Sequence, residues 1–288
     1  MEIVKLLEKN KFIITAELGP PKGTNLNSFF KQAAYLKGVV HAANVTDQQS
    51  ALMKLGSVAA CHLLKDFGIE PIAQIVCRDK NRIALQSEVL SAAVLGIQNM
   101  LVLTGDPVKI GDHPDAKPVF DVDAADLMAL IQKMNGGMDM TDHPLDGVPG
   151  ICVGAALNPC VDDVETEISK TRRKIEKGAQ FFQTQGIFEI ARFKRFMDRY
   201  QKEGFKVPVL AGIIPLKSVK MANFMNEKIP GIFIPQEMIA RFENQPQAKK
   251  ESIKIACEII EAAKPYCQGV HLMAIGWEEL IPEIVQSI

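Results

Sequence analysis

The sequence predicts an α/β protein with the (β/α)8, or TIM-barrel, fold in a single domain that spans residues 1–288. First, strand-like and helix-like segments alternate almost from end to end, and eight strands are each followed by a helix. Second, the length is close to the roughly 250 residues of such barrels, and no linker rich in Pro, Gly or Ser divides the chain. A doubly wound open sheet is the alternative. It usually has fewer strands and an early phosphate-binding loop, and neither a G-x-G-x-x-G nor a Walker motif occurs here.

The predicted strands are short apolar runs, rich in β-branched residues, that end at polar or turn-forming residues. They cover Phe12–Glu17, Val39–Val45, Pro71–Cys77, Met100–Leu103, Gly150–Leu157, Phe181–Thr184, Val207–Ile214 and Gly269–Ala274.

The predicted helices carry apolar residues at three- and four-residue spacing. They cover Leu26–Leu36, Ala51–Asp66, Ile83–Leu95, Asp123–Lys133, Asp162–Lys177, Phe188–Glu203, Lys217–Asn226, Pro235–Phe242, Gln247–Ala263 and Trp277–Gln286. The first ten residues, MEIVKLLEKN, predict a short amphipathic helix rather than a signal peptide. Pro107–Asp121 and Asn135–Pro149 lack any period and predict long loops, which are often functional inside a compact domain.

Composition narrows the class of protein. The formal net charge is −1 and there is no long basic stretch, which argues against nucleic acid or an anionic membrane as the main partner. No uncharged apolar run approaches the length of a membrane span. None of the six cysteines forms a C-x-x-C pair, so we expect buried, reduced thiols and a cytoplasmic location.

The segment Phe12–Gly23, FIITAELGPPKG, places a carboxylate at the end of a buried strand. The apolar run ends at Glu17, and Gly19-Pro20-Pro21 prevents strand or helix from continuing. The charge must therefore find a partner, face a cavity or be held neutral by a raised pKa. An ion pair with a lysine or arginine of a neighbouring loop is as good an explanation as a functional acid.

In a TIM barrel the active site lies at the carboxyl ends of the strands. The predicted strand ends are rich in carboxylates and amides and poor in metal ligands. They leave a candidate site of two acids, Glu17 and Asp106, with four hydrogen-bonding groups: Thr46, Gln74, Asn158 and Gln185. We expect no metal site and treat each histidine as an ordinary solvated or hydrogen-bonded side chain, His271 included. Neither a Ser–His–Asp system nor a lysine inside a strand is predicted. The set suits proton transfer and the stabilisation of a cationic intermediate on a polar heterocycle.

These residues resemble the methylenetetrahydrofolate reductase family. The resemblance lies in A-E-L-G-P-P-K-G after the first strand, L-T-G-D after the fourth, R-R-K-I-E-K-G-A before the sixth and T-Q-G-I-F after it. It covers nearly the whole catalytic barrel of the short prokaryotic form. The motifs G-P-P-K-G and G-D-H-P-x-A-K-P-V-F-D are most similar to those of enzymes from anaerobes that use a reductive acetyl-CoA pathway. In that group a second, zinc-containing subunit often accompanies the reductase.

The resemblance implies reduction of 5,10-methylenetetrahydrofolate to 5-methyltetrahydrofolate, a one-carbon step that also serves methionine biosynthesis, through a bound flavin recharged by NADH or NADPH. Glu17 would be the general acid that protonates N10, with a raised pKa. Asp106 would stabilise the developing cation, and Gln185 would bind the pterin and the nicotinamide amide. The flavin-contacting positions would be Thr46, Gln74, Thr104, Gly105, Asp106, Asn158, Glu167 and Lys174. Without the resemblance, Asp106 is better explained as a turn cap, and Glu167 and Lys174 as solvated helix residues.

Several positions depart from the better-known form of the family. Gln74 and Asn158 stand where histidines are expected, Thr104 replaces an arginine, and Val219 replaces a stacking aromatic residue. A tyrosine expected near Asp123 is also missing. These changes leave the flavin open between FAD and FMN, and they leave the electrons to come from the nicotinamide directly or through a partner subunit. We also expect an oligomer. The alternative function is a flavin-free, folate-binding or methyl-transfer subunit of a larger one-carbon complex.

Overall fold

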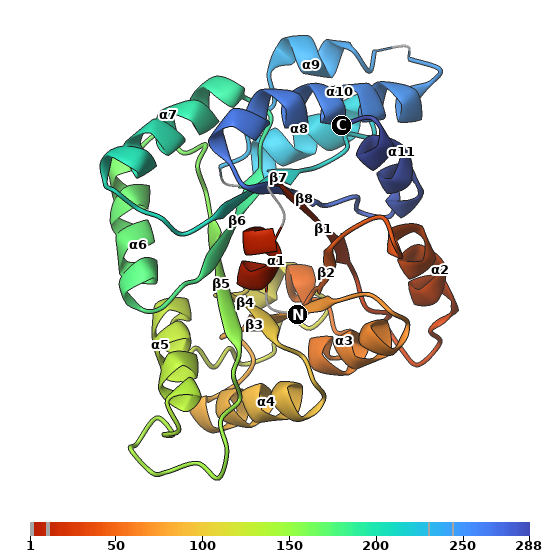
Figure 1. Cartoon of the computed structure of the whole chain (residues 1–288). Coiled ribbons are helices and arrows are strands. Elements are labelled where there is room, and N and C mark those ends of the chain that lie inside the picture. Colours follow the sequence, from red (N-terminus) through yellow and green to blue (C-terminus); the bar gives the residue numbers. More distant parts are fainter. Residues whose placement is uncertain (1–2, 10–11, 230, 244) are drawn as a thin grey trace.

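The computed structural model describes residues 3–9, 12–229, 231–243 and 245–288. Eight parallel strands pair in sequence order, and β8 pairs with β1 to close the barrel (Figure 1). The strands are β1 (Ile13–Leu18), β2 (Ala42–Val45), β3 (Pro71–Val76), β4 (Asn99–Leu103), β5 (Cys152–Leu157), β6 (Phe181–Gly186), β7 (Val209–Ile213) and β8 (Gly269–Leu272). The predicted TIM-barrel fold is therefore confirmed.

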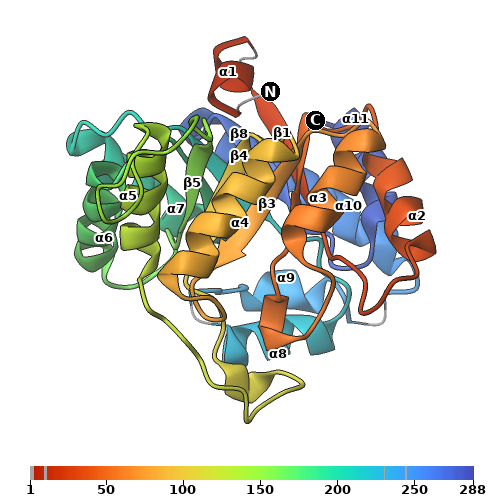
Figure 2. The ribbon, with the colours of Figure 1, turned by 90° about the horizontal axis from the view of Figure 1, so that it is seen from below.

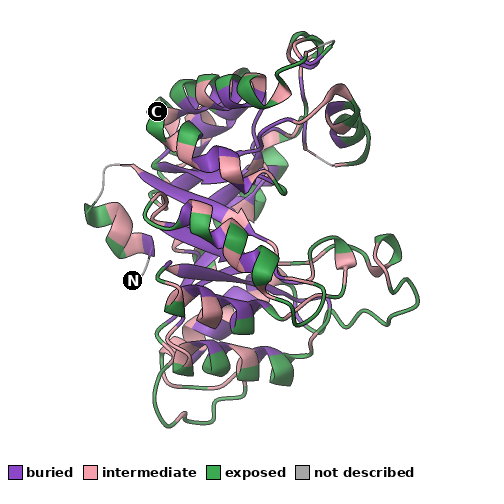
Figure 3. Cartoon of the chain, turned by 90° about the vertical axis from the view of Figure 1, so that its right-hand side faces the viewer, coloured by how far each residue is buried: buried purple, intermediate pink, exposed green. Residues whose placement is uncertain are grey.

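The helices form a ring outside the strands, and their apolar faces meet the outward side chains of the barrel (Figure 2). They are α2 (Asn27–Leu36), α3 (Ser57–Asp66), α4 (Arg82–Val94), α5 (Ala124–Asn135), α6 (Val164–Glu176), α7 (Ile190–Lys202), α8 (Val219–Lys228), α9 (Gln236–Ala240), α10 (Ala248–Ala263) and α11 (Ile281–Gln286). Figure 3 shows the result: buried strands inside, and helices whose outer surfaces are exposed.

Three predicted boundaries are wrong for local reasons. Residues Val39 and Val40 are not part of β2, because their N–H groups both donate to the Leu36 carbonyl and form a turn. The helix expected from Ala51 begins only at Ser57, after a 3-10 turn, η1 (Gln49–Ala51), and a loop. The last predicted helix is divided into a 3-10 turn, η4 (Glu278–Leu280), and α11.

The amino-terminal end of the barrel is filled by an apolar layer and closed by a short helix, α1 (Ile3–Lys9). The fully buried Ile3 belongs to one apolar cluster with a side chain from each of seven strands, namely Ile13, Ala42, Ile72, Leu101, Cys152, Phe181 and Leu210. The Ile3 N–H donates to Asn99 Oδ1 at 2.8 Å. Figure 2 shows α1 at one end of the barrel and the loop after β4 at the other. Met1, Glu2 and Asn10 of the predicted amino-terminal helix lie outside the described residues.

The cysteines are all free thiols, five of them buried and Cys257 half-buried. Burial, the largest effect, raises the pKa of Cys77 and Cys160 to about 12. The prediction of buried, reduced thiols is confirmed for five of the six. Within the described residues, every helix is too short or too polar to cross a membrane.

Candidate active site

A layer of buried polar side chains crosses the barrel interior directly above the apolar layer. Side chains alternate along a strand, so the residues two positions beyond the apolar layer also point inward. Gln183 Nε2 donates to Asn44 Oδ1 at 3.0 Å, and Asn44 Nδ2 returns a bond to Gln183 Oε1 at 2.7 Å. Thr15 Oγ1 lies 2.9 Å from His271 Nδ1. These hydrogen bonds fix the imidazole of His271 and the amides of Asn44 and Gln183 in the barrel interior.

Glu17 lies one layer higher, at the carboxyl end of β1, as predicted. Its side chain is 12% exposed. Gln74 Nε2 donates to Oε2 at 2.9 Å, and His271 Nε2 lies 3.8 Å from the same oxygen, an ion-pair rather than a hydrogen-bond distance. Gln49 Nε2 donates to the other oxygen, Oε1, at 3.1 Å. The acid thus sits at the barrel mouth with polar partners on both oxygens.

The expectation of a raised pKa for Glu17 is wrong in this structure. Burial acts to raise the pKa of the carboxyl, but the interaction with His271 and the amides of Gln74 and Gln49 outweigh it and hold the pKa below its usual value. The two amides favour the ionised form because they donate hydrogen bonds to the carboxylate, and the histidine favours it through its charge interaction. The loop-lysine or loop-arginine partner considered from the sequence is replaced by a histidine of the neighbouring strand.

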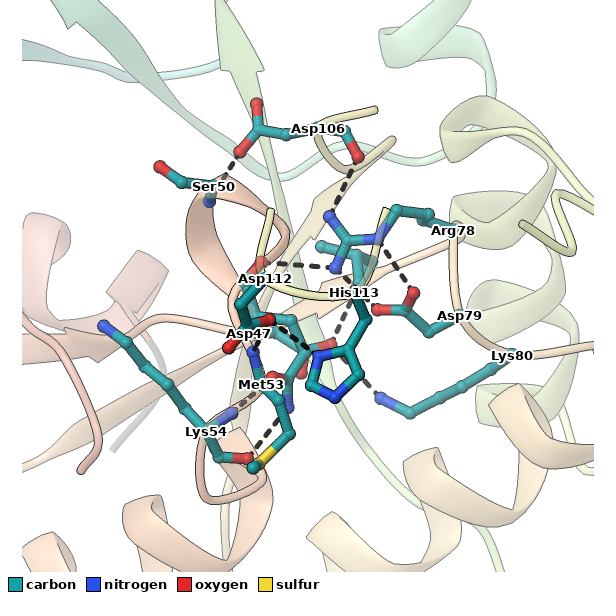
Figure 4. Close-up of polar contacts among 12 residues, drawn as sticks. Asp47, Ser50, Met53, Lys54, Arg78, Asp79, Lys80, Asp106, Asp112 and His113 are labelled. Atoms are coloured by element: carbon teal, nitrogen blue, oxygen red, sulfur yellow. Dashed lines mark hydrogen bonds and ion pairs between the residues drawn. The ribbon is translucent and has the colours of Figure 1, made fainter. Parts of the chain in front are cut away.

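Asp106, the second predicted acid, is held by two loops at the same end of the barrel (Figure 4). Its side chain accepts a hydrogen bond from the Ser50 backbone N–H at 2.8 Å, and its carbonyl accepts one from Arg78 Nη1 at 2.9 Å. The residue is exposed, so its carboxylate is accessible from the mouth. The adjacent residues Gln49 and Ser50 therefore contact the two predicted acids, one each.

Arg78 joins three loops from within the protein, although only 2% of it is exposed. Besides Asp106, its guanidinium donates to the Gln48 carbonyl at 3.2 Å and to both oxygens of Asp79 at 2.6 and 2.8 Å. These contacts tie the ends of β2, β3 and β4 together, as Figure 4 shows. Arg78 thereby fixes the backbone that carries Asp106.

Thr46 and Gly105 also lie at the mouth. The Thr46 N–H donates to Leu18 O and extends the ladder of β2, so strand alternation points the Thr46 side chain inward like Asn44. Its hydroxyl is buried and makes no hydrogen bond in the described part of the chain. Gly105 has φ +94°, and a Cβ there would lie 3.0 Å from Arg78 Cβ, so a larger residue is disfavoured. The neighbouring Thr104 is exposed.

Gln185 lies at an irregularity in the β6–β7 ladder, which falls between Gln183 and Gly186. Its Oε1 accepts a hydrogen bond from the Gly186 N–H at 3.0 Å. Bulges of this kind are common beside active sites, where they redirect a side chain. The amide is half-buried, and its nitrogen donates no hydrogen bond to another described residue.

Asn158, Glu167 and Lys174 form a separate group outside β5. Glu167 Oε1 accepts from the Asn158 N–H at 3.1 Å, and Lys174 Nζ donates to the Ala156 carbonyl at 2.6 Å and lies 3.9 Å from Glu167 Oε1. Glu167 is 5% exposed, and burial lowers the pKa of Lys174. Neither is a solvated helix residue. The group braces the end of β5, and no contact recorded for the described residues joins it to Glu17.

Sequence reasoning missed three residues of this site. His271 was treated as an ordinary histidine, but strand alternation in β8 would have placed it inward beside Glu17. Gln49 and the buried Arg78 lie in or next to loops, and their contacts depend on backbone conformations that the sequence does not display. Among the described residues no group of three or more His, Cys, Asp or Glu side chains is arranged to hold a metal ion.

A protein-family model described as methylenetetrahydrofolate reductase matches residues 2–288. Methylenetetrahydrofolate reductase 1 of Schizosaccharomyces pombe is 22% identical over 230 residues, which cover 77% of this chain and 36% of that protein. 5,10-Methylenetetrahydrofolate reductase of Pectobacterium carotovorum is 25% identical over 187 residues, which cover 64% and 57% of the two chains. The chain thus spans less than two thirds of the length of either relative.

Solved structures support the fold. A Clostridium thermocellum protein, described as binding two copies of 5-methyl-5,6,7,8-tetrahydrofolic acid, superposes with a TM-score of 0.63 at 17% identity, covering 99% of this chain and 98% of that one. EDTA monooxygenase of Chelativorans sp. BNC1 gives a TM-score of 0.59 at 11% identity, covering 96% and 94%. Because the family model covers nearly every residue, we conclude that the chain belongs to the methylenetetrahydrofolate reductase family.

Proposed function

We propose that this protein reduces 5,10-methylenetetrahydrofolate to 5-methyltetrahydrofolate with the help of a bound flavin. The observation that carries the proposal is the position of Glu17: in a chain that matches the reductase family over residues 2–288, a carboxyl group lies at the barrel mouth between a histidine and two amides. Folate reduction needs an acid at this place, because opening the five-membered ring of the substrate requires a proton on N10.

His271 is a partner of the acid Glu17. It lies 3.8 Å from the carboxylate, and this interaction helps to hold the pKa of the carboxyl below its usual value. Transfer of a proton from Glu17 to N10 leaves the Glu17 carboxylate, and the ring opens to a cationic 5-iminium group on the substrate. Thr15 Oγ1, 2.9 Å from His271 Nδ1, keeps the imidazole oriented during the transfer.

Asp106 stabilises the cation electrostatically. Its carboxylate is exposed toward the mouth and is oriented by the Ser50 N–H, so it needs no rearrangement when positive charge develops. Gln185 offers amide hydrogen bonds to the pterin and, in the other half reaction, to the nicotinamide amide.

The residues at the mouth fit a flavin. The buried Thr46 hydroxyl makes no hydrogen bond among the described residues, and Gly105 keeps the backbone open at the end of β4. The residues that would hold the flavin, FAD or FMN, are Thr46, Gln74, Thr104, Gly105, Asp106, Asn158, Glu167 and Lys174. When bound, the flavin supplies the hydride that reduces the iminium carbon.

NADH or NADPH is the proposed electron source. Val219, the first residue of α8, cannot stack as an aromatic residue would. Delivery of electrons through a zinc-containing partner subunit in an oligomeric complex is therefore part of the proposal.

The test is the visible absorption spectrum of the purified protein without air, before and after NADH and then methylenetetrahydrofolate. We expect a flavin spectrum that the folate restores after reduction. Failure of NADH to bleach it, with bleaching by dithionite, would assign the electrons to a partner. Absence of flavin after incubation with FAD or FMN would contradict the proposal and favour a folate-binding or methyl-transfer subunit.

A variant tests the acid. Glu17→Gln is expected to keep the flavin and to lose folate turnover, whereas Glu176→Gln, at the exposed end of α6, should behave like the wild type. Unchanged folate turnover in Glu17→Gln would refute the role of Glu17.

A further inference from the structure

The segment between β2 and α3 has an unusual backbone. Gln48, Ser50 and Ala51 all have positive φ, of 47°, 56° and 56°, although none of them is glycine. Such conformations are costly for residues with a Cβ and persist only where the surroundings impose them. Strained non-glycine backbone next to a candidate site suggests that the segment serves the site.

Contacts from three directions impose this conformation. The Gln48 side chain bonds both backbone groups of Lys54, at 2.8 and 3.1 Å, and Arg78 Nη2 donates to the Gln48 carbonyl. The Ser50 N–H is held by Asp106. The loop after β4 presses on the other side, where a Cβ on Gly111 would lie only 2.0 Å from the Ala51 carbonyl oxygen.

The strain turns one side chain toward the mouth. Gln49 is exposed, yet its Nε2 donates to Glu17 Oε1 at 3.1 Å. The other carboxylate oxygen, Oε2, is turned to the buried Gln74 and His271. Oε1 is therefore the oxygen on the exposed side, the side from which a substrate nitrogen approaches, and Gln49 is its partner among the described residues.

An N–H group at Oε1 opposes the transfer of a proton from that oxygen. A protonated Oε1 and the Gln49 amide would present two donors to each other, so the amide must move before Glu17 can donate from this side. The Gln49 side chain can move at low cost because it is exposed. The contacts that fix the loop are made by Gln48 and Ser50 and not by Gln49.

Resting on the proposed function, we infer that Gln49 is a positioning residue: it holds Glu17 ionised through Oε1 and withdraws when the substrate N10 approaches, which releases Glu17 to take up and donate a proton. Gln49 acts through Glu17 and not on the substrate itself.

The charged surroundings of Glu17 allow a clean test. His271 on β8 is the titratable group in contact with the carboxylate, while β3 presents the neutral Gln74. On the side of the β1–α2 loop, Lys54 Nζ lies 3.4 Å from the position of a Cβ on Gly19. None of these groups is altered by a substitution at position 49.

Gln49→Leu keeps the size of the side chain and removes the donor. In a general-acid reaction kcat/KM falls above the pKa of the acid. Loss of a donor to the ionised form raises that pKa, so the alkaline limb of the profile should move up by about 0.5–1 pH unit. Above the limb the variant should be several-fold faster than the wild type, a gain that mere structural damage would not produce. Ser50→Ala, which retains the backbone N–H to Asp106, should leave the limb in place.

A second readout is independent of turnover. In protein labelled with 13C at the glutamate carboxyl carbons, the Glu17 resonance, assigned by its loss in Glu17→Gln, should titrate at higher pH in Gln49→Leu. Unmoved limb and resonance in Gln49→Leu, with an inactive Glu17→Gln, would overturn the inference and leave the proposed function intact. Full turnover by Glu17→Gln would overturn both.

Discussion

Replacing Arg78 by methionine should cost both stability and turnover, because a single buried guanidinium joins the ends of β2, β3 and β4. Its bonds to the carbonyls of Asp106 and Gln48 have a charged donor, and such bonds contribute about 1.5–3 kcal/mol each. The bonds to Asp79 count for less, because the side chain of Asp79 is 36% exposed and water can replace the partner. Methionine carries no charge, so the variant avoids the cost of burying a guanidinium, and this offsets part of the lost free energy. We expect a net decrease of about 2–4 kcal/mol in the free energy of unfolding.

The loss should extend to catalysis because the backbone of Asp106 loses an anchor. If the proposed function holds, a displaced carboxylate stabilises the substrate cation less well, and we expect kcat/KM for folate reduction to fall by roughly ten- to a hundredfold. Urea unfolding followed by circular dichroism gives the stability, and steady-state kinetics give the turnover.

Arg82→Met is the matched control. Arg82 also binds an aspartate with two nitrogens, Nε and Nη2 to Asp121, but its side chain is 46% exposed. That variant should change stability little and turnover not at all. Equal losses of stability in the two variants, or wild-type kcat/KM in Arg78→Met, would refute the reasoning that burial makes Arg78 the joint of the three loops.

Three further predictions concern other parts of the molecule. Gly154→Ala should lower the free energy of unfolding by about 1–3 kcal/mol, because the new methyl group would lie 2.2 Å from the Phe181 ring. Phe181→Leu in the same chain should recover part of this loss. Additive losses in a double-mutant cycle would count against the packing explanation. The bonds from the Arg82 side chain and backbone lower the pKa of Asp121 to about 2, so the contribution of Asp121 to stability is present above its unfolded pKa of about 3.9 and is lost as the pH falls toward 2. Urea midpoints should therefore separate wild type from Asp121→Asn at neutral pH and converge in acid, and a constant difference would contradict the shift. Cys257 should react first with a thiol reagent, and the five buried cysteines only on unfolding; several equally fast thiols would show that the core opens readily.

The sequence predicted the barrel because its signals are local. Buried strands read as continuous apolar runs, and helix periods are visible in windows of a dozen residues. The errors occur at turns, whose backbone hydrogen bonds the apolar pattern does not display. Val39 and Val40 have the side chains of strand residues. They are excluded from β2 because their N–H groups form a turn on the Leu36 carbonyl.

The site was predictable to the extent that strand ends define it. Glu17, Thr46, Gln74 and Asp106 meet at one mouth because parallel strands bring their carboxyl ends together. The pKa of Glu17 was not predictable, since its sign depends on His271, which lies 254 positions away in the chain and comes into contact only when β8 closes on β1. The partners Gln49 and Arg78 depend on loop backbones that no periodic pattern describes.

The helix that covers the amino-terminal end has a consequence for exchange with solvent. Within the described residues, Ile3 and the apolar layer fill the barrel beneath the interior histidine. We therefore expect the labile hydrogens of His271 and Gln183 to exchange with solvent from the side of Glu17, and a molecule lying across the mouth to slow that exchange.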